Sequence, residues 1–475
     1  MNTLRKCLCC CTFFVLLHAC AVGPDYKRPD MASITPPDWR WKIAEPRDEA
    51  PKGEWWKIFH DAVLDELENF AIMGNQDLRA AVARVDAARA TARISRSDFF
   101  PALSLDPLVK RERTSGNLPT PIPIYIPAAH VNTFSVPFDL SYEVDLWGRV
   151  RRSFESAHAQ AQASVADYRN VLLALTADVA TNYFLFRSLE AEIAVLQRTV
   201  ALRSETVRIL QGRFDSGAIP GIDLAQAKTE VASAKADLAD AVRRRAETVD
   251  ALALLCGKPA SSFKVAPGAG KIDPPVVPVG LPSSLLERRP DIARVERNLQ
   301  SKNAQIGVAK AAYFPVLQLT GQIGYLSTEV SSLFTEASSV WSIAPSLRLP
   351  LFNAGRTAAG VEKAVASYEE ARAQYQQTVL TAFKEVEDSL AQIVLQNEQA
   401  NALREAAANA ERVVTMARGR YEAGSTNYLE VVDTERTTIQ YELRLAQLDA
   451  RRFAATVRLI KALGGGWEGA KPVSK

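Results

Sequence analysis

Residues that could carry out chemistry are few in this chain, and they do not gather into a catalytic motif. There is no H-E-x-x-H zinc motif, no phosphate-binding loop, no G-x-S-x-G nucleophile turn and no cysteine pair of the zinc-binding type. We therefore expect no enzyme activity, no metal and no cofactor. The histidines are widely scattered: His18, His60, His130 and His158.

The most suggestive charged pair is Glu430 and Asp433, three positions apart shortly after a glycine turn. Carboxylates near a helix start complement the helix dipole, which is one interpretation of the pair. If several copies of the chain brought these acids together around an axis, their repulsion would cost on the order of 1 kcal/mol or more at an intermediate dielectric. Such a ring would also attract cations. The residues alone leave both interpretations open.

A long helical hairpin must position these acids, and the chain contains two such hairpins. Apolar residues recur every three or four positions from Val150 to Gln211 without a proline, which predicts one helix of about 60 residues, roughly 90 Å long. The stretch DSGAIPG, with Gly217, ends that helix and reverses the chain, and EAGSTN, with Gly424, does the same later.

The two hairpins belong to an internal duplication. Gly355 and Gly424 repeat the spacing of Gly148 and Gly217, and a further helix precedes each hairpin. The expected organisation begins with a signal peptide (1–19) and an acylated amino-terminal segment with an equatorial region (20–74). The first repeat (75–280) has a helix, a β-hairpin at about 102–147 and a helical hairpin at 149–256. The second repeat (281–464) has a helix, a β-hairpin at about 316–352 and a helical hairpin at 355–463, and a tail (465–475) follows.

Each repeat also contains a β-hairpin whose side chains alternate between apolar and polar, as in FSVPFDLSYEVDLW. Four strands of roughly ten residues have the length that crosses a membrane when tilted. Four strands cannot close a barrel, and lipid does not tolerate open strand edges, so copies of the chain must pair through these strands. Two copies would give eight strands around a filled interior, and three would give twelve around water.

The amino terminus predicts export. Arg5 and Lys6 precede the apolar run CLCCCTFFVLL, as in a secretory signal. The sequence LLHAC resembles a bacterial lipobox, so we expect covalent lipid on Cys20; a plain secretory signal is the alternative. Ala21, in place of an aspartate, favours the outer membrane. Cys256 remains as a buried free thiol, and the net charge of +3 gives no sign of a nucleic-acid partner.

The motifs CAVGPDYKRP, WWKIFHDAVLDELE, DLSYEVDLWGRVRR, GLPSSLLERRPDI and LFNAGR, with the two paired turns, resemble the TolC family of outer-membrane efflux proteins, in its acylated OprM- and NodT-like branch. The resemblance implies a mixed α+β membrane protein, a homotrimer whose twelve-stranded outer-membrane β-barrel continues into a long periplasmic α-helical barrel. It also implies the channel of a tripartite efflux or export system, with a periplasmic adaptor (membrane fusion) protein and an inner-membrane pump as partners.

The resemblance further assigns roles to residues of the two turns. Thr426 stands where one branch of the family has a latch arginine, so that ionic lock is not expected here. The implied sites are a periplasmic gate of Asp433, Glu430 and Leu429, a hydrogen-bonded tie between hairpins at Tyr421 and Asp223, and adaptor-docking tips at Gly217, Gly424, Arg213 and Arg420.

Two other classes of protein share some of these features. An acylated periplasmic adaptor would have one helical hairpin flanked by soluble β-domains, and a structural coiled-coil lipoprotein would not need strands. The chain has two hairpins, each preceded by strands of membrane length, which favours the channel. The sequence names neither the transported substrates nor the particular adaptor and pump.

Overall fold

The structure, a computed structural model, describes residues 21–32, 34–38, 40, 53–116, 127–267, 273–277 and 288–465. The expected signal peptide, Cys20 and nearly all of the expected tail lie outside the described residues. The chain forms two compact units, one from residues 1–29, 85–164 and 295–375, the other from residues 30–84, 165–294 and 376–475. Each unit takes segments from both halves of the sequence, so the units do not follow the expected repeat boundaries, which remain a prediction.

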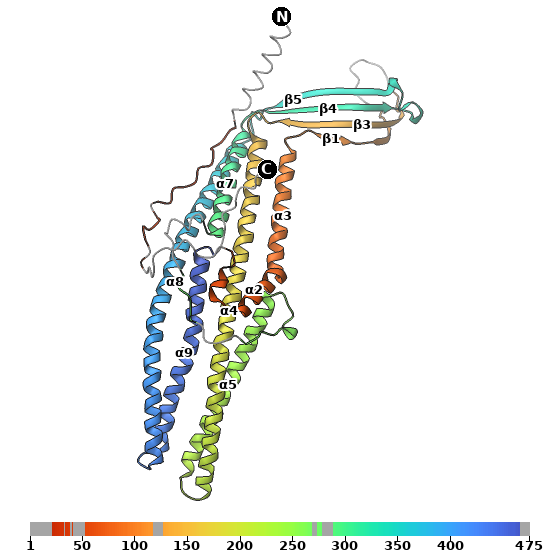
Figure 1. The fold of residues 1–475 in the computed structure, drawn as a ribbon. Helices are drawn as coiled ribbons and strands as arrows, with labels where there is room; N and C mark the ends of the chain where they lie inside the picture. Colours follow the sequence, from red (N-terminus) through yellow and green to blue (C-terminus); the bar gives the residue numbers. More distant parts are fainter. Residues whose placement is uncertain are drawn as a thin grey trace. The chain divides into compact units, whose positions relative to one another are not determined.

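Most of the described chain is helical, and its longest helices repeat in length (Figure 1). The helices are α2 (Ala62–Gly74), α3 (Gln76–Ser97), α4 (Arg149–Asp215), α5 (Gly221–Leu255), α7 (Pro290–Ala311), α8 (Arg356–Glu422) and α9 (Tyr428–Ala462). Helices α4 and α8 have 67 residues each, and α5 and α9 have 35 each. The pairs α4–α5 and α8–α9 lie where the two helical hairpins were expected, whereas α2 was not expected. None of the described helices combines the length and apolarity needed to cross a bilayer.

The first unit holds one antiparallel sheet. Its strands are β1 (Ala102–Leu105), β2 (Leu108–Arg113), β3 (His130–Val144), β4 (Val316–Ser327) and β5 (Ser339–Arg348), in the order β1-β3-β4-β5 with β2 also paired to β3. The two expected β-hairpins therefore join through β3 and β4. The first expected strand is interrupted, because Pro107 between β1 and β2 has no N–H to donate to a ladder.

The register of this sheet aligns apolar side chains across the strands. Phe138 lies opposite both Leu105 and Ile323, and Ile323 lies opposite Trp341. All four side chains are exposed in the single chain. The neighbouring row is polar, with Gln322 donating to Asp139 at 2.9 Å. The sheet thus has an apolar row that no described part of the chain covers.

The junction between the sheet and the helices of the first unit is fixed by Trp147. Its ring stacks on Phe314 at 4.7 Å between centroids, and its Nε1 donates to the Pro315 carbonyl oxygen at 2.9 Å. The amino-terminal segment reaches the same place, since the Val22 N–H donates to the Trp147 carbonyl at 2.9 Å. The residues that follow Cys20 are therefore held at the start of α4.

The core of the second unit is aromatic. Phe184 of α4 stacks on Phe453 of α9 with centroids 4.2 Å apart. Asp61 caps α2 by accepting from the Val63 and Leu64 N–H groups, and it also accepts the Tyr183 hydroxyl at 2.7 Å. Cys256 is buried and unpaired, as expected, and burial raises the pKa of its thiol to about 11.

Candidate functional site: the helical tips and the junction between hairpins

Each helical hairpin of the second unit reverses at a glycine in the left-handed region. Gly217 has φ +73° and Gly424 has φ +69°, and a side chain at either position would meet no atom within 4 Å. The same two hydrogen bonds close each turn; the outer one runs from Ala218 N–H to the Arg213 carbonyl at 2.8 Å, and from Ser425 N–H to the Arg420 carbonyl at 2.9 Å. The turns need glycine for its backbone conformation and not for space.

The second tip is closed by a network around Glu430. Asn427 caps α9 by accepting from the Glu430 N–H at 3.2 Å. The Glu430 carboxylate in turn accepts from Arg420 Nη1 at 2.7 Å and from the Thr426 hydroxyl. Arg420 lies in the last turn of α8 and Glu430 in the first turn of α9, so the pair joins the two sides of the turn. Much of the Glu430 charge is therefore neutralised within the tip.

The other two expected gate residues are more exposed. The Asp433 side chain is 60% exposed and lies 3.5 Å from Arg436 Nη1. Leu429 is also exposed, at 43%. Of the two acids, Asp433 presents the less compensated charge at the surface, because Arg436 donates mainly elsewhere.

Tyr421 and Asp223, the expected tie between the hairpins, do not contact each other in the way that the resemblance implies. Tyr421 instead contacts Arg213, one of the expected docking arginines. The Arg213 guanidinium lies over the Tyr421 ring, 5.9 Å from its centroid, and Tyr421 also packs on Tyr428 at 5.6 Å. Within this single chain, no hydrogen bond between Tyr421 and Asp223 is found among the described residues. Asp223 lies in the first turn of α5, where its charge complements the dipole.

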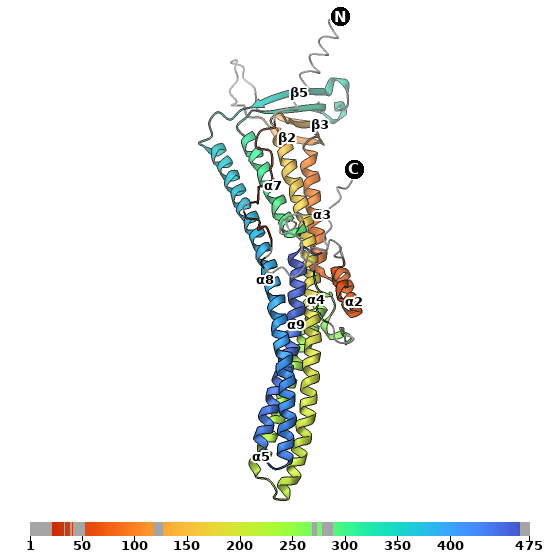
Figure 2. The ribbon, with the colours of Figure 1, turned by 60° about the vertical axis from the view of Figure 1, so that its left-hand side comes forward.

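An apolar cluster packs the two hairpins together just above the tips. Its members come from both hairpins, which lie side by side in Figures 1 and 2. The cluster joins segments some two hundred positions apart. Separating the hairpins would expose its apolar surface to water, which is unfavourable. Burial also raises the pKa of its Tyr428 to about 12. The buried members are Leu210, Leu224, Ala227, Ala417, Tyr428, Val431 and Val432.

A buried carboxylate lies next to this cluster. Glu230 of α5 is 6% exposed and is held by two arginines. Arg203 of α4 donates to the Glu230 carbonyl at 3.0 Å and lies 3.0 Å from its Oε2 atom. Arg436 of α9 donates from Nε to Glu230 Oε1 at 3.0 Å. We call Arg203, Glu230 and Arg436 the junction triad. The triad was not expected from the sequence, where the available signal was a glutamate on the buried stripe of a helix.

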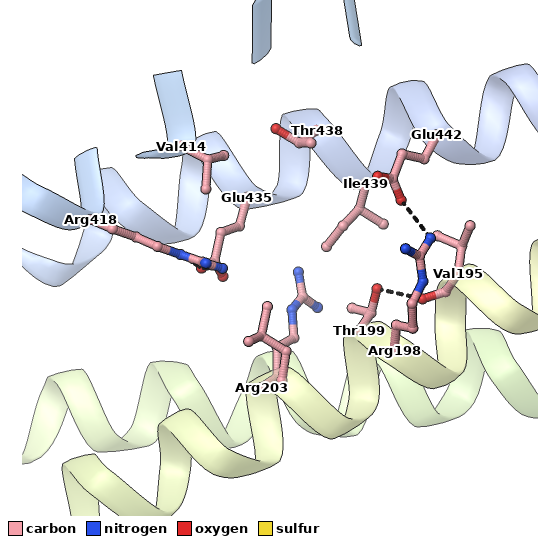
Figure 3. Close-up of a pocket in the computed structure, with 11 residues that line it drawn as sticks. Val195, Arg198, Thr199, Arg203, Val414, Arg418, Glu435, Thr438, Ile439 and Glu442 are labelled. Atoms are coloured by element: carbon pink, nitrogen blue, oxygen red, sulfur yellow. Dashed lines mark hydrogen bonds and ion pairs between the residues drawn. The ribbon is translucent and has the colours of Figure 1, made fainter. Parts of the chain in front are cut away.

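A groove of about 170 Å³ opens beside the junction triad, between α4 and the α8–α9 hairpin. Figure 3 shows the Arg203 guanidinium pointing into it from α4, with the Arg418–Glu435 ion pair, 2.7 Å long, on the opposite wall. A second ion pair, Arg198 to Glu442 at 3.5 Å, crosses the groove at its other end. The hairpins are therefore linked by charge as well as by apolar contact.

In the described parts of the chain, no group of three or more His, Cys, Asp or Glu side chains could hold a metal ion.

An antiparallel sheet with an uncovered apolar row, in one chain with two long helical hairpins, is typical of a membrane channel with a helical extension. Comparison with known proteins agrees with this class. The family model for outer membrane efflux proteins matches residues 69–258 and 281–465. The chain therefore belongs to the outer membrane efflux protein family, a family of transport channels and not of catalysts, and it is an outer-membrane component of an efflux system.

Particular relatives cover almost the whole chain. It is 34% identical to the outer membrane protein OprJ of Pseudomonas aeruginosa, over 95% of this chain and 94% of that protein. It is 33% identical to the toluene efflux pump outer membrane protein TtgI of Pseudomonas putida, over 95% and 97%. The solved open state of the MtrE outer membrane channel of Neisseria gonorrhoeae superposes with a TM-score of 0.83 at 30% identity, covering 94% of this chain and 98% of that one.

Proposed function

We propose that three copies of this chain, each anchored by lipid on Cys20, form an outer-membrane conduit that is gated at its periplasmic helical tips. The sheet supports the trimer, because β5 and the β1–β2 strand are edges without a partner among the described strands. Lipid does not tolerate open edges. Pairing of β5 with the β1–β2 edge of the next copy closes a twelve-stranded barrel, and its apolar row then faces lipid.

The observation that carries the gate is the asymmetry of the junction triad. Both arginines bind Glu230, but the Arg203 side chain is 10% exposed and the Arg436 side chain is 55% exposed. If the α8–α9 hairpin moves away from the α4–α5 hairpin, Arg436 leaves into water and Glu230 keeps its buried partner Arg203. Losing a half-exposed pair costs little, whereas an unpaired buried carboxylate would be costly. The triad can therefore open reversibly on one side.

Single-channel recording in planar bilayers tests the gate. The Arg436→Gln variant is expected to open more often than the unmodified channel, since the α8–α9 hairpin loses its charged contact with Glu230. Arg404→Gln is the matched control, because Arg404 lies exposed on α8 and, within the residues that the structure describes, hydrogen-bonds only to Asn401 of its own helix. The absence of any pore, even in an Asp433→Ala variant, would overturn the channel itself.

We also propose that the tips dock a periplasmic adaptor protein that connects the channel to an inner-membrane pump. Exposed apolar side chains at the two tips support this, namely Ile222 at 65% and Leu429 at 43% exposure. Arg213 and Arg420 contribute by shaping the tips, through Tyr421 and Glu430. An Ile222→Ser variant is expected to lose co-purification with the adaptor. Val242→Ser, a change at another exposed apolar residue farther along α5, is expected to retain it.

A further inference from the structure

A polar cavity of about 590 Å³ lies in the second unit, far along the helices from the tips. It is bounded by α4, α7, α8 and α9, and most of its wall is charged or carries hydroxyl and amide groups. This volume falls within the range, roughly 300 to 1,000 Å³, that holds small molecules in proteins. None of the gate or docking residues described above lines it.

The carboxylates around this cavity already have cationic partners. The buried Arg289 lies 2.6 Å from Asp291 and 2.7 Å from Glu385, and its Nη1 also donates to the Ala462 carbonyl at 2.9 Å. Asp388 pairs with Lys384 at 2.6 Å. Arg289 is therefore a fixed part of the wall that Asp291 and Glu385 share, and each of the three acids has a cationic partner of its own or in common.

Two cations of the wall are left without a carboxylate. Arg458 and Lys461 lie one turn apart on α9, and within the described ranges no acid is at ion-pair distance from either. The strongest contact of Arg458 is with a neutral group, since its Nη2 donates to Gln392 Oε1 at 2.7 Å. Like charges at this spacing repel, so an anion between them would stabilise the wall.

A third cation is only partly compensated. Arg294 of α7 lies 3.6 Å from Asp167, and Arg84 takes the same carboxylate at 3.4 Å. The helix dipole explains a cation at Lys461, in the last turn of α9, but that effect fades within one turn and does not account for Arg294. Positive charge is thus in excess on two sides of one cavity.

We propose that this cavity binds a small multivalent oxyanion of the phosphate or dicarboxylate class, with Arg458 and Lys461 as its charged partners. The guanidinium fork of Arg458 matches two oxygens of one phosphate or carboxylate group. Gln377 of α8 supplies a neutral donor on the facing wall, because its Nε2 amide uses only one of its two N–H groups, on Thr381 Oγ1 at 3.4 Å. The site is independent of the gate, because it shares no residue with the tips or the junction triad.

Calorimetric titration of the full-length, detergent-solubilised protein with inorganic pyrophosphate, at fixed ionic strength, tests this site. We expect one saturable site per chain, and binding about tenfold weaker in an Arg458→Gln, Lys461→Gln double variant, as for loss of about 1.4 kcal/mol of charge-assisted contact. A Gln392→Glu variant keeps the shape of the cavity and gives Arg458 its own carboxylate, so it is expected to weaken binding as well.

An Arg404→Gln, Arg412→Gln variant is the matched control, since it removes two exposed cations of α8 outside the cavity. Equal weakening in this control, or no saturable binding by the unmodified protein, would overturn the site. A parallel titration with succinate separates the dicarboxylate source from the phosphate source. If the Arg458→Gln, Lys461→Gln variant dissociates into single chains while the unmodified protein binds neither anion, the cations serve carboxylates of a second copy and the proposal is wrong.

Discussion

Arg436 of α9 donates from its Nε atom to Glu230 Oε1 of α5 at 3.0 Å, so a half-exposed arginine of one helical hairpin holds a buried carboxylate of the other. The same carboxylate is held from α4 by Arg203, which is nearly buried. The two arginines therefore differ in what their removal leaves behind.

Glu230→Gln is expected to destabilise the junction more than Arg436→Gln. Glu230→Gln leaves the buried Arg203 without a carboxylate, which costs about 3 kcal/mol or more. Arg436→Gln removes a half-exposed partner, which costs about 1 kcal/mol or less. Hydrogen exchange of the amides at residues 428–440 measures how much each variant destabilises the junction. Glu442→Gln, which removes the exposed pair with Arg198, is the control, and equal losses for Glu230 and Arg436 would contradict the asymmetry.

The two acids of the second tip are expected to differ in their effect on ion selectivity. Asp433→Asn should reduce the preference for cations, because Asp433 is exposed and only loosely compensated. Glu430→Gln should change it little, because Arg420 at 2.7 Å already balances that charge. Reversal potentials in asymmetric salt measure the preference. A loss in Glu430→Gln as large as in Asp433→Asn would show that the tip network opens in the working channel.

Alanine at the turn glycines is expected to destabilise the tips. Gly217→Ala and Gly424→Ala should each cost about 1 kcal/mol, because both positions have positive φ. Gly212→Ala and Gly419→Ala are matched controls on the same two helices, where the backbone is helical and a side chain meets open space. The controls should stabilise the protein by up to about 1 kcal/mol. Thermal melts compare the four variants. If the change in melting temperature has the same sign at the turn glycines as at the helical glycines, the positive φ of the turns does not set their need for glycine.

The stability of the second unit is expected to fall as pH rises, because of Glu68. This side chain of α2 is fully buried, both carboxylate oxygens lack a hydrogen-bond partner among the described residues, and burial raises its pKa well above the ordinary value, with Asp65 adding to the effect. The folded protein thus keeps a proton that the unfolded chain loses above about pH 4.3. Between that value and the raised pKa, the free energy of unfolding falls by about 1.4 kcal/mol per pH unit.

Glu68→Gln should remove this dependence and melt above the unmodified protein at pH 8. Glu66→Gln, a change at the exposed neighbouring acid, is the control. Melting curves from pH 5 to pH 8 compare the three proteins. If the slope of the Glu68→Gln variant matches that of the unmodified protein, the carboxyl is ionised and hydrated in the folded state.

By itself the sequence determined the long helices, most of the strands and the equal spacing of the turn glycines in the two halves. Helix and strand periods are local properties, and equal glycine spacings mark the turns at Gly217 and Gly424 wherever the hairpins lie. The motifs also identified the family, and the family supplied the gate residues. The break at Pro107 could have been predicted from the sequence, since proline cannot donate to a ladder. The alternation of apolar and polar residues on both sides of Pro107 instead indicated one continuous strand.

Only the tertiary structure decided which charges meet. Glu230, Arg203 and Arg436 come from three helices, and periodicity states that a face is buried without stating which face of another helix covers it. The same holds for Glu430, because its carboxylate is balanced by Arg420 only where the fold of the tip brings the two side chains together. Coulomb interactions depend on distances of a few ångströms between residues far apart in the chain, and the packing of the hairpins sets those distances.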